Sequence, residues 1–275
     1  MFFQCGKFRL SLDRPLIMGV VNITPDSFSD GGRFAKADAA IAQAHRLIDE
    51  GADILDFGGE STRPGSDVVP LDEERRRILP VLDALRDVPV PLSVDTQKPQ
   101  LMREAIAAGA AMINDINALR APGALDAVAA TDAGVCFMHM QGNPKIMQHD
   151  PHYDDVVAEV RAFLEERLTA ARAAGMAGER LAIDPGFGFG KTLEHNLALL
   201  RHLREFAKLG VAIVAGLSRK SALGLITGRA VDERVNASVA AMLIAVQRGA
   251  HIVRVHDVAA TRDALMVLAA VQGQG

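Results

Sequence analysis

Short apolar runs alternate along the chain with longer segments in which apolar residues recur at helical spacing. The apolar runs are rich in β-branched residues, and they predict strands over residues 16–22, 52–58, 90–95, 110–115, 134–139, 180–184, 211–218 and 251–256. Helical patterns follow these runs, for example over residues 35–50, 71–86, 154–175 and 257–271. Strands that alternate strictly with helices build a parallel sheet, so the pattern predicts an α/β fold, a closed (β/α)8 TIM barrel.

The chain begins with two further short apolar stretches, residues 2–5 and 8–12, on either side of Gly6 and Lys7. This pattern predicts a short N-terminal β-hairpin within residues 1–14 that plugs the barrel floor. The length of 275 residues is close to that of one such barrel. No Pro/Ser-rich linker or break in composition divides the chain. We therefore expect a single domain over residues 1–275.

Most of the predicted strands end in a hydrogen-bonding or ionisable residue. These residues are Asn22, Asp95, Asn114 with Asp115, His139, Asp184, Ser218 with Lys220, and Arg254 with His256. In a barrel the carboxyl ends of all strands lie on one face, where active sites are found. Helix capping accounts for Asp, Asn and Ser at such ends, but it does not account for His, Lys and Arg. The pattern therefore predicts one polar pocket.

Three connections that follow predicted strands are longer than ordinary βα loops, namely residues 23–34, 59–70 and 140–153. The first two are rich in Gly, Pro, Ser and Asp. Long loops on one rim can exclude water and complete a site. We expect these loops to surround the pocket, although plain surface insertions would also have this pattern.

The net charge of −4 and the pI near 6.1 exclude a general nucleic-acid binding surface, which must be basic to displace counterions from phosphates. A small anion would need a local positive cluster. Lys220 follows the seventh predicted strand, and Arg254 and His256 end the eighth, in the region where barrels often bind phosphate. Scattered solvated cations are the alternative interpretation.

Neither a membrane span nor a signal peptide is predicted. No apolar window approaches the length that crosses a bilayer, and residues 1–10 lack the apolar core of a signal peptide. Cys5 and Cys136 are the two cysteines, and their apolar or terminal surroundings favour reduced thiols. We expect a cytoplasmic protein with no nucleic-acid or membrane partner.

Residues 185–192 read PGFGFGKT and follow a predicted strand, which invites a nucleotide-binding interpretation. Pro185, however, stands where a P-loop needs Gly, and Pro has no N–H for a phosphate. The segment better fits a turn kept small so that a flat ligand can approach Phe189. No motif for a transition metal or a nucleophilic triad occurs. A Mg²⁺ ion with Asn22 as its protein oxygen is easier to place.

The interior acids Asp95 and Asp184, with Asn114 between them in the chain, suit a ligand rich in N–H donors, because a carboxylate can accept two parallel hydrogen bonds. Buried carboxylates without such a partner would be costly. Pairing within the protein, with Lys220 or Arg254, is the alternative, and a ligand could displace such a resting pair.

Taken together, the segments resemble the dihydropteroate synthases of bacterial folate synthesis. The matching stretches are NITPDSFSDGG (22–32), GGESTRPG (58–65), SVDT (93–96), IND (113–115), MHMQGNP (138–144), DPGFGFGK (184–191), GLSRKS (216–221) and RVHD (254–257). They run in order across nearly the whole chain. Ile146 departs from the polar residue expected in the loop after the fifth strand, which touches no catalytic position.

The resemblance implies condensation of 6-hydroxymethyl-7,8-dihydropterin diphosphate with 4-aminobenzoate, giving 7,8-dihydropteroate and pyrophosphate. It implies catalytic roles for Lys220, Arg254, His256 and Asp95. The substrate-binding residues that it implies are Thr62, Arg63, Pro64, Asp95, Asn114, Met138, Asp184, Phe189, Gly216, Ser218, Lys220, Arg254 and His256. Asn22 would hold Mg²⁺, and residues 25–31 and 61–65 would close over both substrates.

Other functions remain open from the residues. Lys220 could serve as the Schiff-base nucleophile of a barrel lyase. A pterin-binding methyltransferase relative would share the pterin pocket but would not need the diphosphate residues. A binding-only paralogue would have lost some of those residues. The nearly uniform apolar run at residues 239–246 has apolar side chains on more than one face, and the need to bury them predicts a homodimer through helices away from the pocket.

Overall fold

The computed structural model describes residues 1–23 and 33–273. Its central sheet closes in the order β10-β3-β4-β5-β6-β7-β8-β9, and every pairing in it is parallel. These strands are β3 (Leu16–Asn22), β4 (Ile54–Gly58), β5 (Leu92–Asp95), β6 (Met112–Asp115), β7 (Gly134–Met138), β8 (Leu181–Asp184), β9 (Ala212–Ala215) and β10 (Ile252–Val255). The predicted (β/α)8 barrel is confirmed.

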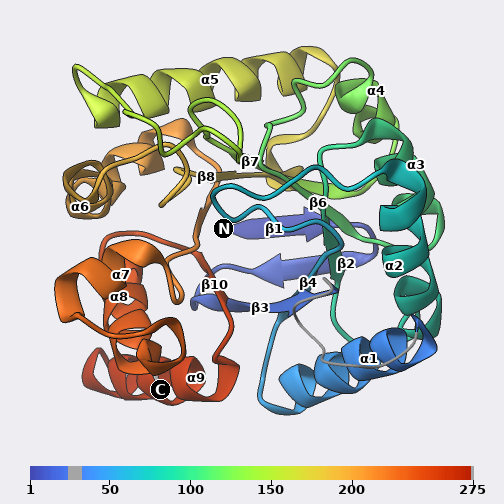
Figure 1. The fold of residues 1–275 in the computed structure, drawn as a ribbon, viewed down its shortest axis with the longest axis horizontal. Helices are drawn as coiled ribbons and strands as arrows, with labels where there is room; N and C mark the ends of the chain where they lie inside the picture. Colours follow the sequence, from blue (N-terminus) through green and yellow to red (C-terminus); the bar gives the residue numbers. More distant parts are fainter. Residues whose placement is uncertain (24–32, 274–275) are drawn as a thin grey trace.

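A ring of helices surrounds the sheet (Figure 1). Its members are α1 (Arg33–Asp49), α2 (Leu71–Ala84), α3 (Pro99–Ala107), α4 (Ala124–Ala129), α5 (Val156–Ala173), α6 (Leu193–Arg201), α8 (Val235–Gln247) and α9 (Val258–Val271). Four shorter helices join them: α7 (Ser221–Thr227), η2 (Gly178–Arg180), η3 (Leu203–Leu209) and η4 (Val231–Glu233). In the described ranges no helix is both long and apolar enough to cross a membrane.

Strand alternation divides the hydrophobic residues between two layers. Successive side chains on a strand face opposite sides of the sheet. Leu55 and Phe57 of β4 therefore belong to the large cluster between sheet and helices, whereas Ile54 belongs to a smaller cluster inside the barrel. Asp56 faces the same way as Ile54, into the interior. This alternation places polar residues of the strand ends above an apolar floor.

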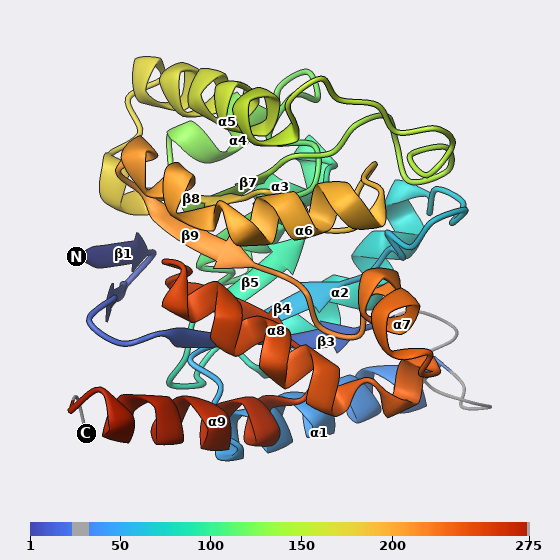
Figure 2. The same cartoon turned by 90° about the vertical axis from the view of Figure 1, so that its left-hand side faces the viewer.

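The N-terminal hairpin pairs β1 (Phe2–Cys5) with β2 (Phe8–Ser11) in antiparallel register. Phe3 and Cys5 are fully buried and pack with the apolar interior residues of the barrel. Figure 2 shows the hairpin at one end of the barrel, opposite the loops 59–70 and 140–153. The predicted hairpin is confirmed, and it covers the barrel floor.

Most barrel strands are shorter than the apolar runs that predicted them, and only the run 16–22 coincides with its strand. The polar residues at the ends of these runs often lie in the βα loop. Ser218 follows β9, which ends at Ala215, and His256 follows β10, which ends at Val255. The backbone of such a loop residue can bond to a side chain instead of to a neighbouring strand. The His256 backbone N–H, for example, donates to the Ser218 hydroxyl at 3.2 Å.

Candidate active site at the barrel mouth

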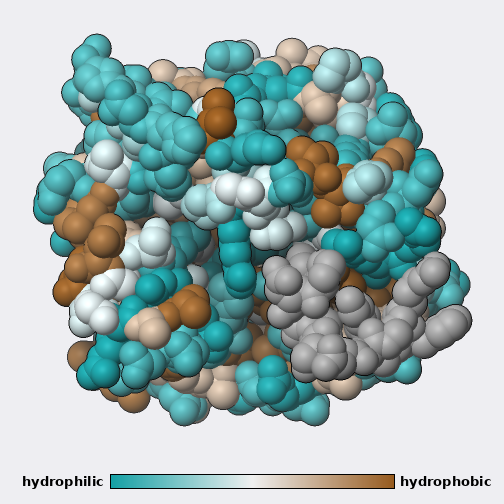
Figure 3. All heavy atoms as spheres, in the orientation of Figure 1, coloured by the Kyte–Doolittle hydropathy of each residue, from teal (hydrophilic) through white to brown (hydrophobic). Residues whose placement is uncertain are grey.

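The face on which the barrel strands end is the one seen in Figures 1 and 3. Figure 3 shows a hollow near the centre of this face, with hydrophilic residues gathered around it. The loop 59–70 and the loop 140–153 both lie on this rim (Figure 2). The predicted closing segment 25–31 lies outside the described residues.

Arg254 of β10 forms the centre of the polar network in the barrel. Its Nε donates to Asp56 Oδ2 at 2.6 Å, and its Nη2 donates to Asp95 Oδ2 at 3.1 Å. Asn114 donates to the same Asp56 oxygen at 3.2 Å, and Ser93 donates to the other at 2.6 Å. One guanidinium therefore joins carboxylates from two other strands, which brings together Asp95, Asn114 and Arg254 as the sequence predicted.

The charges in this network shift the pKa of its members. Burial raises the pKa of Asp95 to about 8; Arg254 lowers it, and Asp56 raises it. The pKa of Arg254 is raised, because the attraction of its two carboxylates outweighs burial. Two carboxylates share one guanidinium, so a proton on Asp95 relieves their mutual repulsion.

Asp184 and Lys220 form a second charged group beside the first. Burial raises the pKa of Asp184, an effect that the charge of Lys220 opposes. Burial lowers the pKa of Lys220 to about 8, against the attraction of Asp184. A Cβ added to Gly216 would lie 3.6 Å from Asp184 Oδ2 and 3.9 Å from Arg254 Cβ. Gly216 therefore lies between the two groups, and its missing side chain leaves room there.

Ser218 and His256 connect the loops that follow β9 and β10. The Ser218 hydroxyl accepts from the His256 backbone N–H and lies 3.0 Å from its Nδ1. The hydroxyl proton is then free to bond Nδ1, which leaves the proton of the neutral ring on Nε2. Burial, then the charges of Arg254 and Arg219, lowers the pKa of His256 to about 4. The imidazole is therefore neutral at pH 7.

Arg219, between these residues, holds both loops in place. It adopts a left-handed backbone conformation with φ 58°, which is strained for a residue with a side chain. Its guanidinium pairs with Asp257, including a bond of 3.0 Å from Nε, and its backbone N–H donates to Ser238. The ion pair ties the β9 loop to the β10 loop. The sequence interpretation did not single out Arg219 or Asp257.

The loop 185–191 carries Phe189, whose ring centroid lies 4.6 Å from Lys220 Nζ. Its glycines are required by close packing. A Cβ at Gly186 would lie 1.8 Å from the His139 carbonyl oxygen, and one at Gly190 would lie 2.6 Å from the Gln141 oxygen. Both have positive φ. The small turn is confirmed, but neighbouring backbone rather than a ligand explains these two glycines.

His139 was predicted to line the pocket, but it lies instead against Lys191. Its Nδ1 lies 2.9 Å from Lys191 Nζ, and both side chains are buried. Lys191 Nζ also donates to the Phe189 carbonyl at 2.9 Å. Burial, then the charge of Lys191, lowers the pKa of His139 to about 2. This pair fixes the Phe189 loop from behind.

Asp115, the other polar strand end outside the pocket, is structural. Its two carboxylate oxygens accept from the backbone N–H groups of Asn117 and Leu119, each at 2.7 Å. Ala118 and Leu119 both have φ 53°, so the carboxylate stabilises a strained turn. The neighbouring strand position, Asn114, faces the interior because successive side chains alternate.

The loop 59–70 carries Thr62, Arg63 and Pro64. Thr62 is half-buried, and Arg63 and Pro64 are exposed. Arg63 is close enough to His256 for its charge to contribute to the lowered pKa of that ring. No described hydrogen bond joins Thr62 or Pro64 to the Arg254 network. This loop therefore lies at the mouth, near His256.

Beneath this loop lies a buried ion cluster. Lys98 Nζ pairs with Glu60 and with Glu74, and Glu74 is fully buried. Glu60 also accepts from the Val69 backbone N–H at 3.1 Å. The cluster connects the start and end of the loop to α2 and to the loop after β5. The sequence interpretation missed all three charged residues.

Asn22 ends β3 and pairs with Gly58 of β4. A Cβ added to Gly58 would lie 3.6 Å from Asn22 Oδ1. The glycine leaves space beside one neutral oxygen. That donor suits Mg²⁺, which takes few protein oxygens and keeps waters or phosphate oxygens as its other ligands. Among the described residues, no group of three His, Cys, Asp or Glu side chains could hold a metal ion.

Met138 lies in a small apolar cluster at the rim. The cluster contains Ile116, Met138, Met140 and Met147, with Phe189 packed against it. It forms an apolar wall beside the charged groups.

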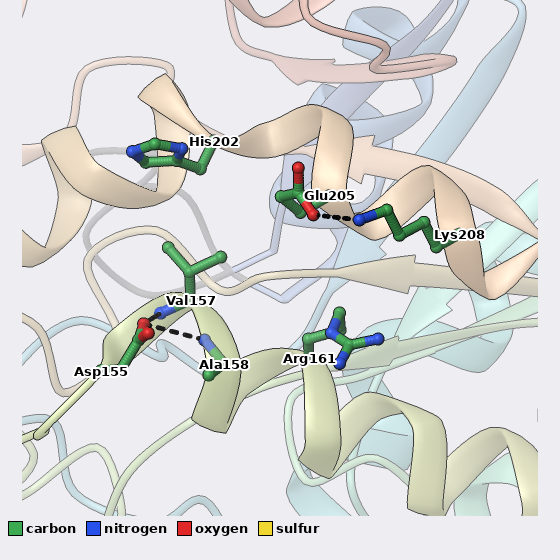
Figure 4. Close-up of a pocket in the computed structure, with 7 residues that line it drawn as sticks. All are labelled: Asp155, Val157, Ala158, Arg161, His202, Glu205 and Lys208. Atoms are coloured by element: carbon green, nitrogen blue, oxygen red, sulfur yellow. Dashed lines mark hydrogen bonds and ion pairs between the residues drawn. The ribbon is translucent and has the colours of Figure 1, made fainter.

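A separate hollow of about 380 Å³ lies between α5 and η3 and is lined by Asp155, Val157, Ala158, Arg161, His202, Glu205 and Lys208 (Figure 4). It shares no residue with the barrel mouth.

Known proteins identify the family. A family model described as pterin binding enzyme matches residues 18–256. A dihydropteroate synthase of Neisseria meningitidis serogroup B is 53% identical over 272 residues, which cover 96% of this chain and 95% of the relative. The chain belongs to the dihydropteroate synthase family. As a member of this family it is a transferase.

Two solved structures of Xanthomonas albilineans dihydropteroate synthase are also similar. One, with 4-aminobenzoic acid, is 57% identical with a TM-score of 0.93, and the match covers 98% of each chain. The other, in complex with 7,8-dihydropteroate, is 54% identical with a TM-score of 0.90 and covers 99% of each chain. These two structures therefore share the overall fold of this chain.

The principal residue that the sequence interpretation missed at this dihydropteroate synthase mouth is Asp56. A signal was available, because Asp56 interrupts the apolar strand run at residues 54–57. A buried charge within a strand needs a partner, and Arg254 supplies it. Attention to strand ends alone passed over this position, which lies two residues before the end of β4.

Proposed function

We propose that this barrel mouth condenses 6-hydroxymethyl-7,8-dihydropterin diphosphate with 4-aminobenzoate, releasing pyrophosphate and forming 7,8-dihydropteroate. The observation that carries the proposal is the position of Arg254. Its guanidinium, from the last strand, contacts Asp56 and Asp95 from the second and third strands. One cation at the centre of an acidic barrel suits a substrate with a donor-rich ring and an anionic tail.

The interior acids and Asn114 would hold the edge of the pterin ring. Carboxylate oxygens accept the parallel N–H bonds that an amidine-like edge offers. Asp184 keeps Oδ2 available, because the Gly186 N–H bonds to Oδ1. Met138 would contact the ring, Gly216 would leave room for it, and Arg254 would stack on its face while its nitrogens remain bonded to the carboxylates.

The diphosphate would lie toward the loops after β9 and β10. Arg254 supplies positive charge, and His256, neutral at pH 7, supplies an Nε2–H hydrogen bond. Thr62 and Arg63 would approach from the loop 59–70. Asn22 would hold a Mg²⁺ ion, which when bound neutralises charge on the leaving diphosphate.

The reaction forms a bond between the aminobenzoate nitrogen and the pterin methylene carbon, and it breaks the bond from that carbon to diphosphate oxygen. The nitrogen loses a proton afterwards. The electron-rich ring stabilises positive charge at the methylene, so we propose a dissociative path. Asp95 and Lys220 would adjust the charge around the ring, and Arg254 and His256 would stabilise the leaving oxygens.

The aminobenzoate slot would be formed by three separate segments. Phe189 supplies an apolar ring, Ser218 lies at the loop after β9, and Arg63 with Pro64 supplies the outer wall. The arylamine is already nucleophilic, so this slot needs no strong base. Its task is to orient the nitrogen toward the methylene carbon.

One observation favours a second function, a lyase that uses Lys220 as a Schiff-base nucleophile. Burial lowers the pKa of Lys220 to about 8, which makes its amine easier to release. At pH 7 most of the amine remains protonated, which favours the electrostatic role. Borohydride treatment with a carbonyl substrate would leave no covalent adduct if Lys220 acts only through its charge.

We also propose a homodimer through helices away from the mouth. Only one side of α8 is buried, and its buried residues are Ser238, Ala241, Met242 and Ala245. Ile244 of the same helix is 40% exposed. On α9, Met266 and Val267 are 60% and 66% exposed. Sedimentation at micromolar concentration should give a dimer, and a monomer would contradict the proposal.

The direct test of the reaction is pyrophosphate release that requires both substrates. Asp184→Ala should abolish binding of the pterin diphosphate, because it removes an acceptor from the ring edge. Arg254→Ala should weaken both binding and turnover. Near-normal activity in either variant would contradict the residue roles. Positional isotope exchange in bound pterin diphosphate without aminobenzoate would support the dissociative path, and its absence would favour direct displacement.

A further inference from the structure

The loop that carries Phe189 is held by side chains at four successive carbonyl oxygens. Lys220 donates to the oxygen of Phe187, and Gln148 donates to that of Gly188 at 2.5 Å. The remaining two bonds have lengths of 2.9 Å, from Lys191 to the Phe189 oxygen and from Tyr153 to the Gly190 oxygen. Each bond fixes one peptide plane, so this stretch of the loop is fixed along its length.

Two of these donors come from the loop 140–153, which lies on the rim. The same loop also contacts the loop 59–70. The Gly65 backbone N–H donates to the Pro144 oxygen at 3.1 Å, and Lys145 pairs with Asp67 at 3.1 Å. The loop 140–153 therefore contacts both loops that would form the aminobenzoate slot. No residue in its central part, 145–150, was assigned a role in that slot.

Gln148 and Lys191 are well placed to set the position of the Phe189 ring. Their bonds fix the peptide before Phe189 and the peptide after it. A phenylalanine side chain has only two rotatable bonds, so its ring follows its backbone closely. The ring also packs against the cluster of Ile116, Met138, Met140 and Met147. Loss of either bond would free one of the two peptide groups that flank Phe189.

We propose that Gln148 and Lys191 are positioning residues for the aminobenzoate slot, acting through the backbone of Phe189. This inference rests on the proposed function. Of the residues proposed for the pterin, Asp95 and Asn114 lie on strands at other positions in the barrel. Asp184 and Lys220 bond to the loop at Gly186 and Phe187, before the two peptides that Gln148 and Lys191 fix. Loss of the loop bonds should therefore affect aminobenzoate and leave the pterin diphosphate largely unaffected.

Gln148→Leu tests this directly, because leucine has a similar volume and no N–H donor. A lost hydrogen bond of about 1 kcal/mol corresponds to roughly a fivefold change in binding. We expect the KM for 4-aminobenzoate to rise about fivefold to tenfold, with the KM for pterin diphosphate unchanged within about twofold. His149→Leu is the matched control, since the neighbouring His149 is exposed, and both KM values should stay near those of the wild type.

A double-mutant cycle separates positioning from general weakening of the fold. Phe189→Ala should itself raise the KM for aminobenzoate, and Gln148→Leu should add little in that background. Lys191→Met should show the same selective effect. Because Lys191 is buried, thermal unfolding should first show that this variant is folded; if it is not, the Gln148 cycle decides the proposal.

The outcomes are distinguishable from those for the proposed function. Wild-type pyrophosphate release with both substrates is measured first, and its absence would overturn the function and this inference together. With an active wild type, only the inference fails if Gln148→Leu changes both KM values equally or neither. Full additivity with Phe189→Ala would also overturn it.

Discussion

At the scale of single residues, the site depends on an imbalance of charge. Asp56 and Asp95 share the guanidinium of Arg254 inside the barrel. Burial is the first reason that the pKa of Asp95 rises to about 8, and Asp56 adds to it. A carboxyl group whose folded-state pKa exceeds its unfolded value binds more protons in the folded state. Stability attributable to it therefore falls as the pH rises toward 8.

Asp95→Asn should remove this dependence, because an amide resembles the protonated carboxyl group and does not ionise. The difference in free energy of unfolding, variant minus wild type, should therefore grow as the pH rises. It should grow by up to about 1.4 kcal/mol per pH unit between roughly pH 5 and pH 8. Urea unfolding at several pH values measures it. Asp67→Asn, at an exposed carboxylate, is the control, and a constant difference for Asp95→Asn would contradict the argument.

Residue-level prediction from the sequence succeeded where a polar side chain follows an apolar strand. Asp95, Asn114 and Arg254 were brought together as expected. It was wrong for His139, which lies against Lys191. A strand end indicates the face of the barrel, but the direction of one side chain depends on the loop that packs over it. That information lies in contacts between distant segments.

At the scale of elements, the loop 59–70 depends on the cluster of Lys98, Glu60 and Glu74. Within this cluster one lysine, Lys98, pairs with both glutamates, and Glu74 is fully buried. Burial raises the pKa of Glu74, while Lys98 lowers it. A buried charge without its partner is far more costly than an exposed one. The cluster therefore anchors the wall that carries Arg63.

Lys98→Met should destabilise the protein by about 3–5 kcal/mol, because it leaves two largely buried carboxylates unpaired. Lys145→Met is the matched control. Lys145 pairs with Asp67, and their side chains are 70% and 87% exposed, so its loss should change stability by less than about 1 kcal/mol. Chemical denaturation measures both, and equal effects would contradict the role of burial.

The kinds of elements and their order were predictable from the sequence, whereas their ends were not. One element lies outside the predicted alternation, because the short helix α7 (Ser221–Thr227) follows β9 before the outer helix α8. Apolar residues such as Val90 and Ala110 extend the predicted strands but precede the observed ones. They belong to or pack against the large hydrophobic cluster, where burial is needed without strand pairing. Hydrophobic pattern reports burial, and strand bounds also depend on which neighbour is available.

At the scale of the whole molecule, the barrel is closed at its sides by β3 with β10 and at its floor by the hairpin. Gly134 of β7 is required at the floor. A Cβ there would lie 2.9 Å from both Phe3 Cζ and Cys5 Cβ. Burial raises the pKa of the Cys5 thiol to about 12, which keeps it unreactive at neutral pH. Thiol reactivity therefore reports how well the hairpin covers the floor.

Gly134→Ala should destabilise the protein by about 1–3 kcal/mol through overpacking, and it should speed labelling of Cys5 as the hairpin moves away. Gly178→Ala is the control, because no atom lies within 4 Å of a Cβ at that position. Thermal unfolding and labelling with a thiol reagent measure the two effects. Unchanged labelling at Gly134→Ala would show that the hairpin is not displaced.

Pairing of the first barrel strand with the last also constrains the order of events during synthesis. Asp56 leaves the ribosome nearly two hundred residues before Arg254, since 198 positions separate them. For the last 159 of these positions the growing chain has both Asp56 and Asp95 and no guanidinium between them. Because a buried charge without its partner is costly, these carboxylates should stay solvated until β10 arrives. Assembly of the Arg254 network and completion of the barrel should therefore be the same late step.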